Sequence, residues 1–326
     1  MADVARIADV SVPTVSRVLS GTHRVSEAKT MRVRAAIELL GFRRSGAARA
    51  LALGRSNTIA VIAGNTARYG YAETIRGIEE AARREGFTVM ITVVESDDES
   101  EVNRATTAVL SQSIAGVVVL RFDRAGVEAL RRIPADVPVV ALSGVREPGG
   151  AQAVIDEMPA AQELIAHLLN LGHSTVHHVR IPPSRTEDGR TVGWRRALKR
   201  ANREIPEIID ATWDPRSGRD IGQSLALRPD ITAVFCGNDE IAMGVIRGLN
   251  DAGLHVPQDV SVVGFDDHPL SELWAPALTT VRQDFADLGR RGFRQLSDTM
   301  AGNPAKHLSA VRPHVVIRDS AAPPSK

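Results

Sequence analysis

Polar and small side chains gather at the start of one predicted helix near the beginning of the chain. Ser11 is a suitable N-cap, and a proline two residues later is tolerated in a first helical turn. With Val15 turned inward, the helix presents five side chains outward: Val12, Pro13, Thr14, Ser16 and Arg17. A guanidinium can donate to guanine O6 and N7 or to a phosphate, and hydroxyls can bond phosphates or base edges. The pattern therefore indicates a helix that contacts nucleic acid through its first turns.

Positive charge is concentrated in this same region. The whole chain has a net charge of +1, but residues 1–56 carry ten Lys and Arg against four Asp and Glu. A small basic module on a mildly acidic body is typical of a DNA-binding head, although a solvated basic tail would have the same composition. Arg24 and Lys29 belong to this basic set and are candidate DNA contacts, and we expect Lys29 to contact phosphate.

Three short amphipathic segments in residues 1–42 predict a helical head. Apolar side chains recur at three- and four-residue spacing, with Ser26 placed to cap the third helix and Gly41 to end it. The pattern favours a helix-turn-helix over a generic three-helix bundle. Residues 43–56 are small, basic and flanked by glycine, which predicts a hinge or linker with a short helix over about 46–53.

From residue 57 onward, runs rich in Val and Ile alternate with amphipathic stretches. The predicted strands are 58–63, 88–94, 115–120, 137–142, 175–181, 231–236 and 260–265. The predicted helices are 72–86, 100–112, 159–171, 238–253 and 284–301. Strands that are apolar throughout and alternate with helices indicate parallel sheets covered on both faces. We expect two α/β lobes with a break near 150–160, and a TIM barrel is the competing architecture.

Several classes of chemistry find no support in the sequence. The single cysteine, Cys236, ends an apolar run and should pack in the core, so neither an intramolecular disulfide nor a cysteine zinc site is predicted. No GxGxxG after a strand, GxxxxGK[ST] or GxSxG motif is present, which argues against an α/β enzyme. The lack of a signal segment argues against an exported sugar-binding protein, and no apolar run approaches the roughly 18 residues of a membrane span. We expect a cytoplasmic protein without catalytic activity, cofactor or metal.

Motifs along nearly the whole chain resemble the LacI family of bacterial repressors. In the head the resemblance rests on Val4-Ala5, Val10-Ser11, Thr14 to Leu19, Gly21, Val25-Ser26, Arg32-Val33 and Gly41-Phe42. In the body it rests on Gly77-Ile78-Glu79, Leu171-Gly172-His173, Arg190 with Gly193-Trp194, Asn238-Asp239, Asp259 to Asp267, Leu278 to Val281 and Gln283. A series of matches this long is specific.

The resemblance implies a sequence-specific transcription regulator, expected to be a repressor. Its sensor would be similar to periplasmic sugar-binding proteins, with the effector, expected to be a sugar or sugar derivative, between two lobes. Carried over by motif, Arg190, Asn238 and Asp266 would hydrogen-bond the effector. Trp213 would lie against it, with a surface or core tryptophan as the alternative. The lobes would comprise about 57–155 with 284–312 and about 156–283 with 313–326.

The resemblance also implies how the hinge and a dimer would bind DNA. Ala48 and Leu51 match the stretch that docks in the minor groove in this family, where Leu51 would be wedged between base pairs. Simple helix packing is the other interpretation of Leu51. A homodimer on a palindromic double-stranded operator is expected, because helix-turn-helix dimers mirror two-fold DNA.

Four departures from the family pattern fall at functional positions. Asp9 replaces the usual glycine in the helix-turn-helix turn, which Asp tolerates better than most residues. Arg44-Ser45 replace the usual Pro-Asn before the hinge. The segments Arg68–Tyr71 and Asp156-Glu157 replace family motifs near the cleft. We therefore expect an unusual effector or a partly altered pocket, and the sequence leaves the identity of the effector and the operator open.

Overall fold

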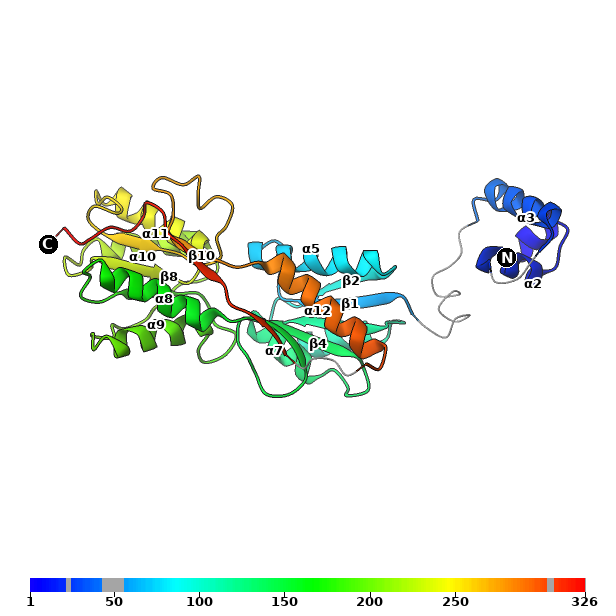
Figure 1. Cartoon of the computed structure of the whole chain (residues 1–326), viewed down its shortest axis with the longest axis horizontal. Coiled ribbons are helices and arrows are strands. Elements are labelled where there is room, and N and C mark those ends of the chain that lie inside the picture. Colours follow the sequence, from blue (N-terminus) through cyan, green and yellow to red (C-terminus); the bar gives the residue numbers. More distant parts are fainter. Residues whose placement is uncertain (22–24, 43–55, 304–307, 326) are drawn as a thin grey trace. The chain divides into compact units, whose positions relative to one another are not determined.

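The computed structural model describes residues 1–21, 25–42, 56–303 and 308–325. The chain divides into two compact units, Met1–Ser56 and Asn57–Lys326, which are called here the head and the body (Figure 1). The predicted hinge helix, with Ala48 and Leu51, lies outside the described residues, as does Arg24.

The described part of the head holds three helices, as the sequence predicted. They are α1 (Ala2–Ile7), α2 (Val12–Ser20) and α3 (Glu27–Leu39). Small and β-branched side chains form their common core: Val4, Ala5, Ala8, Val15, Val33 and Ala36. Asp9, in the turn between α1 and α2, has a φ of 49°, the left-handed conformation for which glycine is the usual residue. The turn therefore survives the replacement of glycine by Asp9.

The first lobe of the body is built on a six-stranded parallel sheet in the order β11-β5-β4-β3-β1-β2. Its strands are β1 (Thr58–Ala63), β2 (Thr88–Val93), β3 (Gly116–Leu120), β4 (Val139–Ser143), β5 (Ala151–Ile155) and β11 (Leu308–Val311). Its helices are α5 (Tyr69–Arg84), α6 (Glu99–Leu110), α7 (Arg124–Arg131) and α12 (Phe285–Met300). Ile59 and Val61 of β1 pack in one hydrophobic cluster, whereas Ala60 and Ile62 pack in another. Both faces of this sheet are therefore covered.

The second lobe repeats this design on a four-stranded parallel sheet in the order β7-β6-β8-β9. Its strands are β6 (His177–Arg180), β7 (Ile209–Asp210), β8 (Ala233–Cys236) and β9 (Ser261–Val263). Its helices are α8 (Glu157–Asn170), α9 (Gly189–Arg200), α10 (Pro215–Leu225) and α11 (Asp239–Asp251). Val234 and Cys236 pack on one face of the sheet, and Ala233 and Phe235 on the other. Cys236 is thus a core residue, as predicted.

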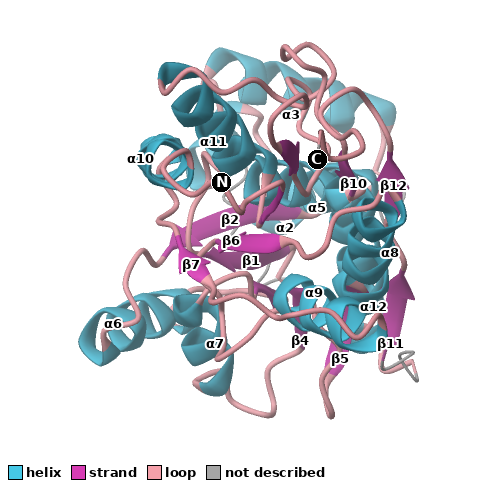
Figure 2. Ribbon diagram, turned by 90° about the vertical axis from the view of Figure 1, so that its left-hand side faces the viewer, coloured by secondary structure: helices cyan, strands magenta, loops and turns pink. Residues whose placement is uncertain are grey.

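The two lobes are connected by three crossings in the described chain. The chain crosses after β5, between β10 (Thr280–Arg282) and α12, and between β11 and β12 (His314–Val316). β10 and β12 pair antiparallel, apart from both larger sheets. Figure 2 shows the strands with helices around them. Because the strands form separate open sheets, the TIM barrel alternative is wrong.

One expectation about the strands needs correction. The sequence predicted that segment 88–94 would be covered on both faces, but β2 lies at the edge of its sheet and is only partly covered. Ile91 and Val93 are exposed there, because the edge strand has a neighbour on one side only. No helix in the described residues is long and apolar enough to cross a membrane.

Candidate ligand cavity and nucleic-acid-binding surface

The predicted nucleic-acid-binding residues of α2 surround its core contact and differ in exposure. Val15 is buried, whereas Val12, Pro13 and Arg17 are exposed. Thr14 and Ser16 are half-buried. Ser11 occupies the N-cap position, and its hydroxyl lies 2.9 Å from the hydroxyl of Thr14.

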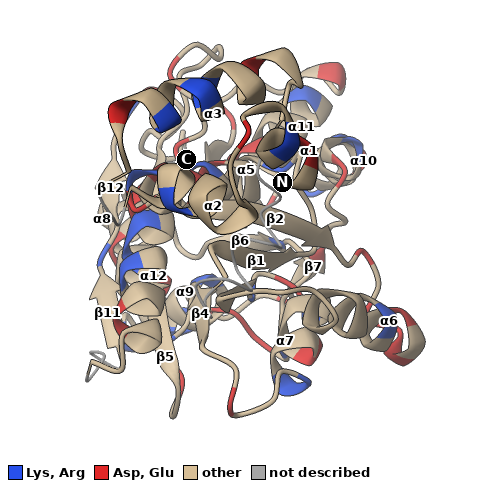
Figure 3. Ribbon diagram, turned by 90° about the vertical axis from the view of Figure 1, so that its right-hand side faces the viewer, with Lys and Arg blue, Asp and Glu red and all other residues tan. Residues whose placement is uncertain are grey.

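The Arg17 guanidinium makes no hydrogen bond or ion pair with another described residue. An unpaired cation on an exposed helix surface is available to phosphates and to base edges. Lys29 is also exposed, in the first turn of α3. Figure 3 shows Lys and Arg residues on both α2 and α3. Arg17 and Lys29 are therefore exposed cations of the described head, as DNA contacts would have to be.

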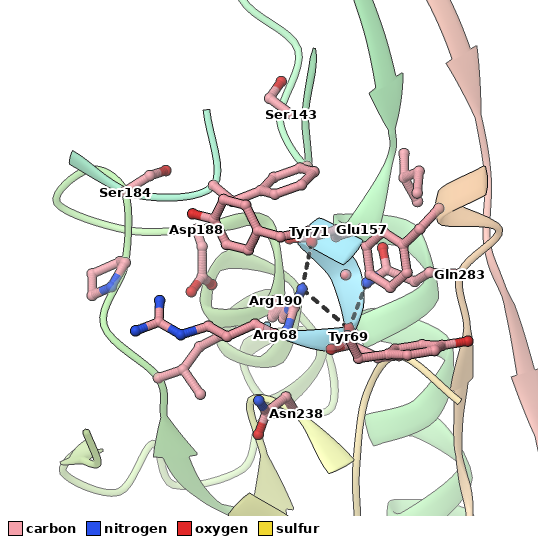
Figure 4. Close-up of a pocket in the computed structure, with 18 of the residues that line it drawn as sticks. Arg68, Tyr69, Tyr71, Ser143, Glu157, Ser184, Asp188, Arg190, Asn238 and Gln283 are labelled. Carbon is pink, nitrogen blue, oxygen red and sulfur yellow. Dashed lines mark hydrogen bonds and ion pairs between the residues drawn. The ribbon is translucent and has the colours of Figure 1, made fainter. Parts of the chain in front are cut away.

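A cavity of about 80 Å³ lies between the two lobes of the body. All four side chains predicted to bind an effector line it: Arg190, Trp213, Asn238 and Asp266. The two segments that depart from the family pattern line it as well, through Arg68 to Tyr71 and Glu157. In Figure 4, Tyr69 and Tyr71 of the first lobe lie close to Glu157, Arg190 and Asn238 of the second. These four residues are distant along the chain, since Arg190 and Asp266 are 76 positions apart, yet they line one cavity.

The ends of the second lobe's strands and helices position the polar side chains. Asn238 follows β8 and caps α11, where its Oδ1 accepts a hydrogen bond of 2.9 Å from the Ile241 N–H. Arg190 lies in the first turn of α9, which Asp188 caps by accepting from the Thr191 N–H at 2.7 Å. Asp266 follows β9 and has a φ of 115°, a strained backbone conformation for a residue with a side chain.

Three protein groups already contact the Arg190 guanidinium. Its Nη1 donates to the Gly237 carbonyl, and its Nη2 donates to Glu157 Oε1 at 2.8 Å. The same Nη2 lies 3.3 Å from Asp266 Oδ1, which also accepts from Gln283 Nε2 at 2.7 Å. Arg190 and Asp266 therefore have protein partners without a ligand. Glu157 supplies the second carboxylate, and the two acids share one guanidinium.

Space for the Glu157 carboxyl group is built into the loop above it. A Cβ added at Gly144 would stand 2.4 Å from Glu157 Cδ, so only glycine leaves room at this position. The Glu157 side chain is 8% exposed. Its position is therefore fixed by packing as well as by the ion pair with Arg190.

Burial shifts the pKa values of the acids around Arg190 upward. Loss of solvation raises the pKa of Glu157 to about 7, against the opposing effect of Arg190. It raises the pKa of Asp266 to about 6 for the same reason. Behind them, burial and the charge of Asp266 raise the pKa of Asp239 to about 8. Asp239 nevertheless accepts hydrogen bonds from Thr280, Ser271 and the His268 N–H. The cluster therefore has too little positive charge to hold all three acids ionised at ordinary pKa values.

The aromatic side chains of the cavity come from both lobes. They are Tyr69, Tyr71, Phe122, Trp213 and Phe285, which include both tyrosines of the chain. The Arg68 guanidinium lies 4.2 Å from the Trp213 ring centroid, so one face of that ring is covered by protein. Tyr71 donates its hydroxyl to Asp123. Trp213 is half-buried, in neither the core nor a fully exposed position.

Two buried polar atoms at the cavity have no hydrogen-bond partner among the described residues. One is Gln283 Oε1, an acceptor, and the other is Arg121 Nε, a donor. Both residues are less than a tenth exposed. Buried polar groups are nearly always paired in folded proteins, so an orphaned acceptor and donor in one cavity mark places for ligand or water atoms. The described His, Cys, Asp and Glu side chains form no group that could hold a metal ion.

Sequence reasoning missed several residues of this cavity. Gln283 was recognised in a motif but not as a site residue, and Glu157 was noted only as a departure from a family pattern. Tyr71 belongs to the other departing segment. Arg121 directly follows β3, so its place at the carboxyl end of a parallel strand was a usable signal. The departures themselves were therefore the best pointers to the residues that were missed.

Comparison with protein-family models gives two matches. A model for bacterial regulatory proteins of the lacI family matches residues 1–45. A model for a periplasmic binding protein-like domain matches residues 165–321.

Characterised proteins match over most of the chain. The ribose operon repressor of Escherichia coli (strain K12) is 34% identical over 298 residues, which cover 89% of each chain. The transcriptional repressor PurR of Klebsiella pneumoniae (strain 342) is 32% identical over 98% of this chain and 96% of its own. Among solved structures, the lac repressor dimer bound to operator and the anti-inducer ONPF has a TM-score of 0.89 and 27% identity, covering 98% of each chain. The regulator CelR in complex with cellobiose has a TM-score of 0.73 and 28% identity over the same share of each chain.

Proposed function

This chain belongs to the LacI family of bacterial regulatory proteins and is a DNA-binding transcription regulator under small-molecule control, and we propose that it is a repressor whose effector is a sugar or sugar derivative. Two relatives support the effector class, since one is named for the ribose operon and another was solved with cellobiose. The relatives are transcription regulators, so we assign the chain no catalytic role and place its action in the cytoplasm, where operator DNA lies.

The observation that carries the effector proposal is the cavity between the lobes. It brings together Arg190, Asn238, Asp266 and Trp213 with two buried polar atoms that have no protein partner. We assign hydrogen bonding to the effector to Asn238, Asp266 and Arg190, with Trp213 as an apolar wall. Because protein groups already engage Arg190 and Asp266, the effector would add to this network or rearrange it.

The size of the cavity limits what can enter without movement. A water needs roughly 10–15 Å³ of such space, so a cavity of about 80 Å³ holds only a handful of waters. Ligand pockets more commonly measure roughly 300–1,000 Å³. An effector larger than one small ring therefore requires the lobes to part. This links ligand entry to a change between lobe arrangements.

For DNA binding we propose that α2 enters the major groove and that Arg17 contacts a base. Ser11, Thr14 and Ser16 would bond phosphates or bases, with Val12 and Pro13 packed against the groove. Arg24 and Lys29 would contact phosphates, and Ala48 and Leu51 would dock in the minor groove. In this scheme residues 1–42 read the operator, 43–56 form the hinge, and 57–326 bind the effector and a second copy of the chain.

The experiment is DNA binding with and without effector. The full chain should bind the DNA upstream of its own gene with an affinity that falls steeply with salt. A thermal-shift screen of metabolites should give a compound that stabilises the parent protein and also changes this DNA affinity. The same compound should stabilise Asp266→Ala and Arg190→Ala much less than the parent. Equal stabilisation of all three proteins would mean that the effector binds elsewhere.

A further inference from the structure

The charges that line the cavity are unequal and unevenly distributed. Four carboxylates line it (Glu157, Asp188, Glu240 and Asp266) together with three guanidinium groups (Arg68, Arg121 and Arg190). Three further acids lie behind the lining: Asp123, Glu147 and Asp239. Of these groups, Glu157 and Asp266 both lie against Arg190, and Asp239 lies behind Asp266, so this part of the cavity is acidic.

Two of the three guanidinium groups that line the cavity are already paired with carboxylates. Arg190 is engaged by Glu157, Asp266 and the Gly237 carbonyl. Arg121 is paired with Glu147, which also holds Arg185 at 2.5 Å. Arg68 stacks on Trp213 and also borders the adjoining surface hollow. An anion placed beside Arg190 would be attracted by one guanidinium but repelled by the two carboxylates that contact it. This balance is unfavourable in a buried site.

An unpaired acceptor completes the acidic end. Gln283 Nε2 is directed to Asp266 by a hydrogen bond of 2.7 Å, which leaves the buried Oε1 without a donor. Reversing the amide would place its oxygen against a carboxylate, so the assignment of the two atoms is determined by the network. A ligand group that donates hydrogen bonds and carries positive charge would satisfy Gln283 and offset the excess of acids.

We propose that the effector carries a protonated amine, held by Glu157, Asp266 and Gln283, and that Glu157 is the residue that selects for this charge. The inference rests on the proposed effector function and names the chemical class of the ligand. In Figure 4, dashed lines mark the contact between Arg190 and Glu157 and the nearby hydrogen bond made by Gln283. The unpaired Arg121 Nε, which comes from the first lobe, would donate to an oxygen of the ligand. A small polyol that bears an amine, such as an amino sugar, has both groups.

The protonation of the acids agrees with this assignment. Burial raises the pKa of Glu157 to about 7, so near neutral pH the site holds a proton where an ammonium group could sit instead. A cationic ligand favours the ionised acid and would displace that proton. Binding of the amine should therefore tighten between about pH 6 and pH 8, until the amine itself loses its proton.

The test is a ligand screen of the full chain in which compounds are divided by charge. Thermal shift is measured with amines, neutral polyols and anions, with glucosamine, glucose and glucose 6-phosphate as one matched set. We expect the tightest ligand to be an amine and to bind at least about tenfold more tightly than its hydroxyl analogue, as loss of one charge-assisted hydrogen bond predicts. Glu157→Gln should remove this preference by weakening the amine about ten- to a hundredfold and the analogue less than about twofold.

Glu163→Gln is the matched control, since it removes the same charge from the same helix at a side chain that is 53% exposed. It should leave both affinities unchanged. If Glu157→Gln does not fold, the pH dependence of ligand binding to the parent protein tests the inference instead. Amine binding should depend on pH, whereas binding of the neutral analogue should not. A tightest ligand that is an anion, or an amine no better than its analogue, would overturn the inference and leave the effector function intact. If no compound in the screen stabilised the protein, both the amine inference and the proposed effector function would be refuted.

Discussion

Replacing Glu157 by Gln tests how much the buried Glu157 carboxylate lowers the free energy of unfolding of the body. The Glu157 carboxylate is buried and shares one guanidinium with Asp266. Burial raises its pKa from the ordinary 4.5 to about 7, which means that the folded chain binds this proton more tightly than the unfolded chain. The free energy of unfolding therefore falls as the pH rises through this interval and is constant above it.

The magnitude follows from the two pKa values. One proton bound differently over one pH unit is worth about 1.4 kcal/mol, so the loss between pH 4.5 and 7 is on the order of 3 kcal/mol. Gln cannot titrate but still offers an oxygen to Arg190. We expect Glu157→Gln to be as stable as the parent protein at neutral pH or more so, with a smaller loss of stability on going from acid to neutral pH. Asp266 and Asp239, whose pKa values burial raises to about 6 and about 8, keep that loss above zero.

The assay is urea unfolding followed by tryptophan fluorescence at several pH values. Trp194, Trp213 and Trp274 are the three tryptophans of the chain and all belong to the body, so the signal reports the body without the head. Glu163→Gln serves again as the control and should follow the parent at every pH. If Glu157→Gln loses stability with pH in parallel with the parent, burial of Glu157 does not carry the cost that we assign to it.

The remaining predictions concern DNA binding and assembly. Arg17→Ala should cost roughly 1–3 kcal/mol per head in operator binding and relax specificity without unfolding the head, as gel-shift titration of specific and random DNA would measure. Lys29→Ala should weaken binding to all sequences alike and reduce the salt slope by about one; a loss confined to the operator would contradict the phosphate assignment. Leu51→Ala should bind the operator less tightly and bend it less in a circular-permutation assay, and unchanged bending would rule out a wedge. The full chain should sediment as a dimer at micromolar concentration, and a monomer both with and without DNA would refute the two-fold operator model.

The local structure of the chain could be predicted because short-range patterns control it. The Val- and Ile-rich runs 58–63 and 115–120 became β1 and β3, and Asn238 caps the helix that follows it, as expected. Asp9 takes the positive φ that its place in the turn required. Each of these outcomes depends on residues a few positions apart, where spacing, capping and backbone preference act directly.

The pairing inside the cavity could not be predicted, because it depends on how distant segments meet. Arg190 and Glu157 are 33 positions apart and become partners only when α8 and α9 pack side by side. The short strand β10 also escaped prediction, since three residues carry too little pattern to distinguish them from a loop. It matters because the segment after β10 brings Gln283 to the cavity. The sequence could therefore indicate which residues meet, but not which of them would already be satisfied by one another.

The distribution of these groups between the lobes determines which ligands can act as effectors. Glu157, Arg190 and Asp266 belong to the second lobe, whereas Arg121 follows β3 of the first. A ligand changes the equilibrium between two lobe arrangements only to the extent that it binds one of them more tightly. A small cation such as methylamine can reach the acidic end but has no oxygen for Arg121. We expect it to bind weakly and to leave DNA affinity unchanged, whereas an amine with hydroxyl groups contacts both lobes and changes it by a coupling of about 1–3 kcal/mol. If methylamine altered operator binding as strongly as the full effector, contact with the first lobe would not be part of the response.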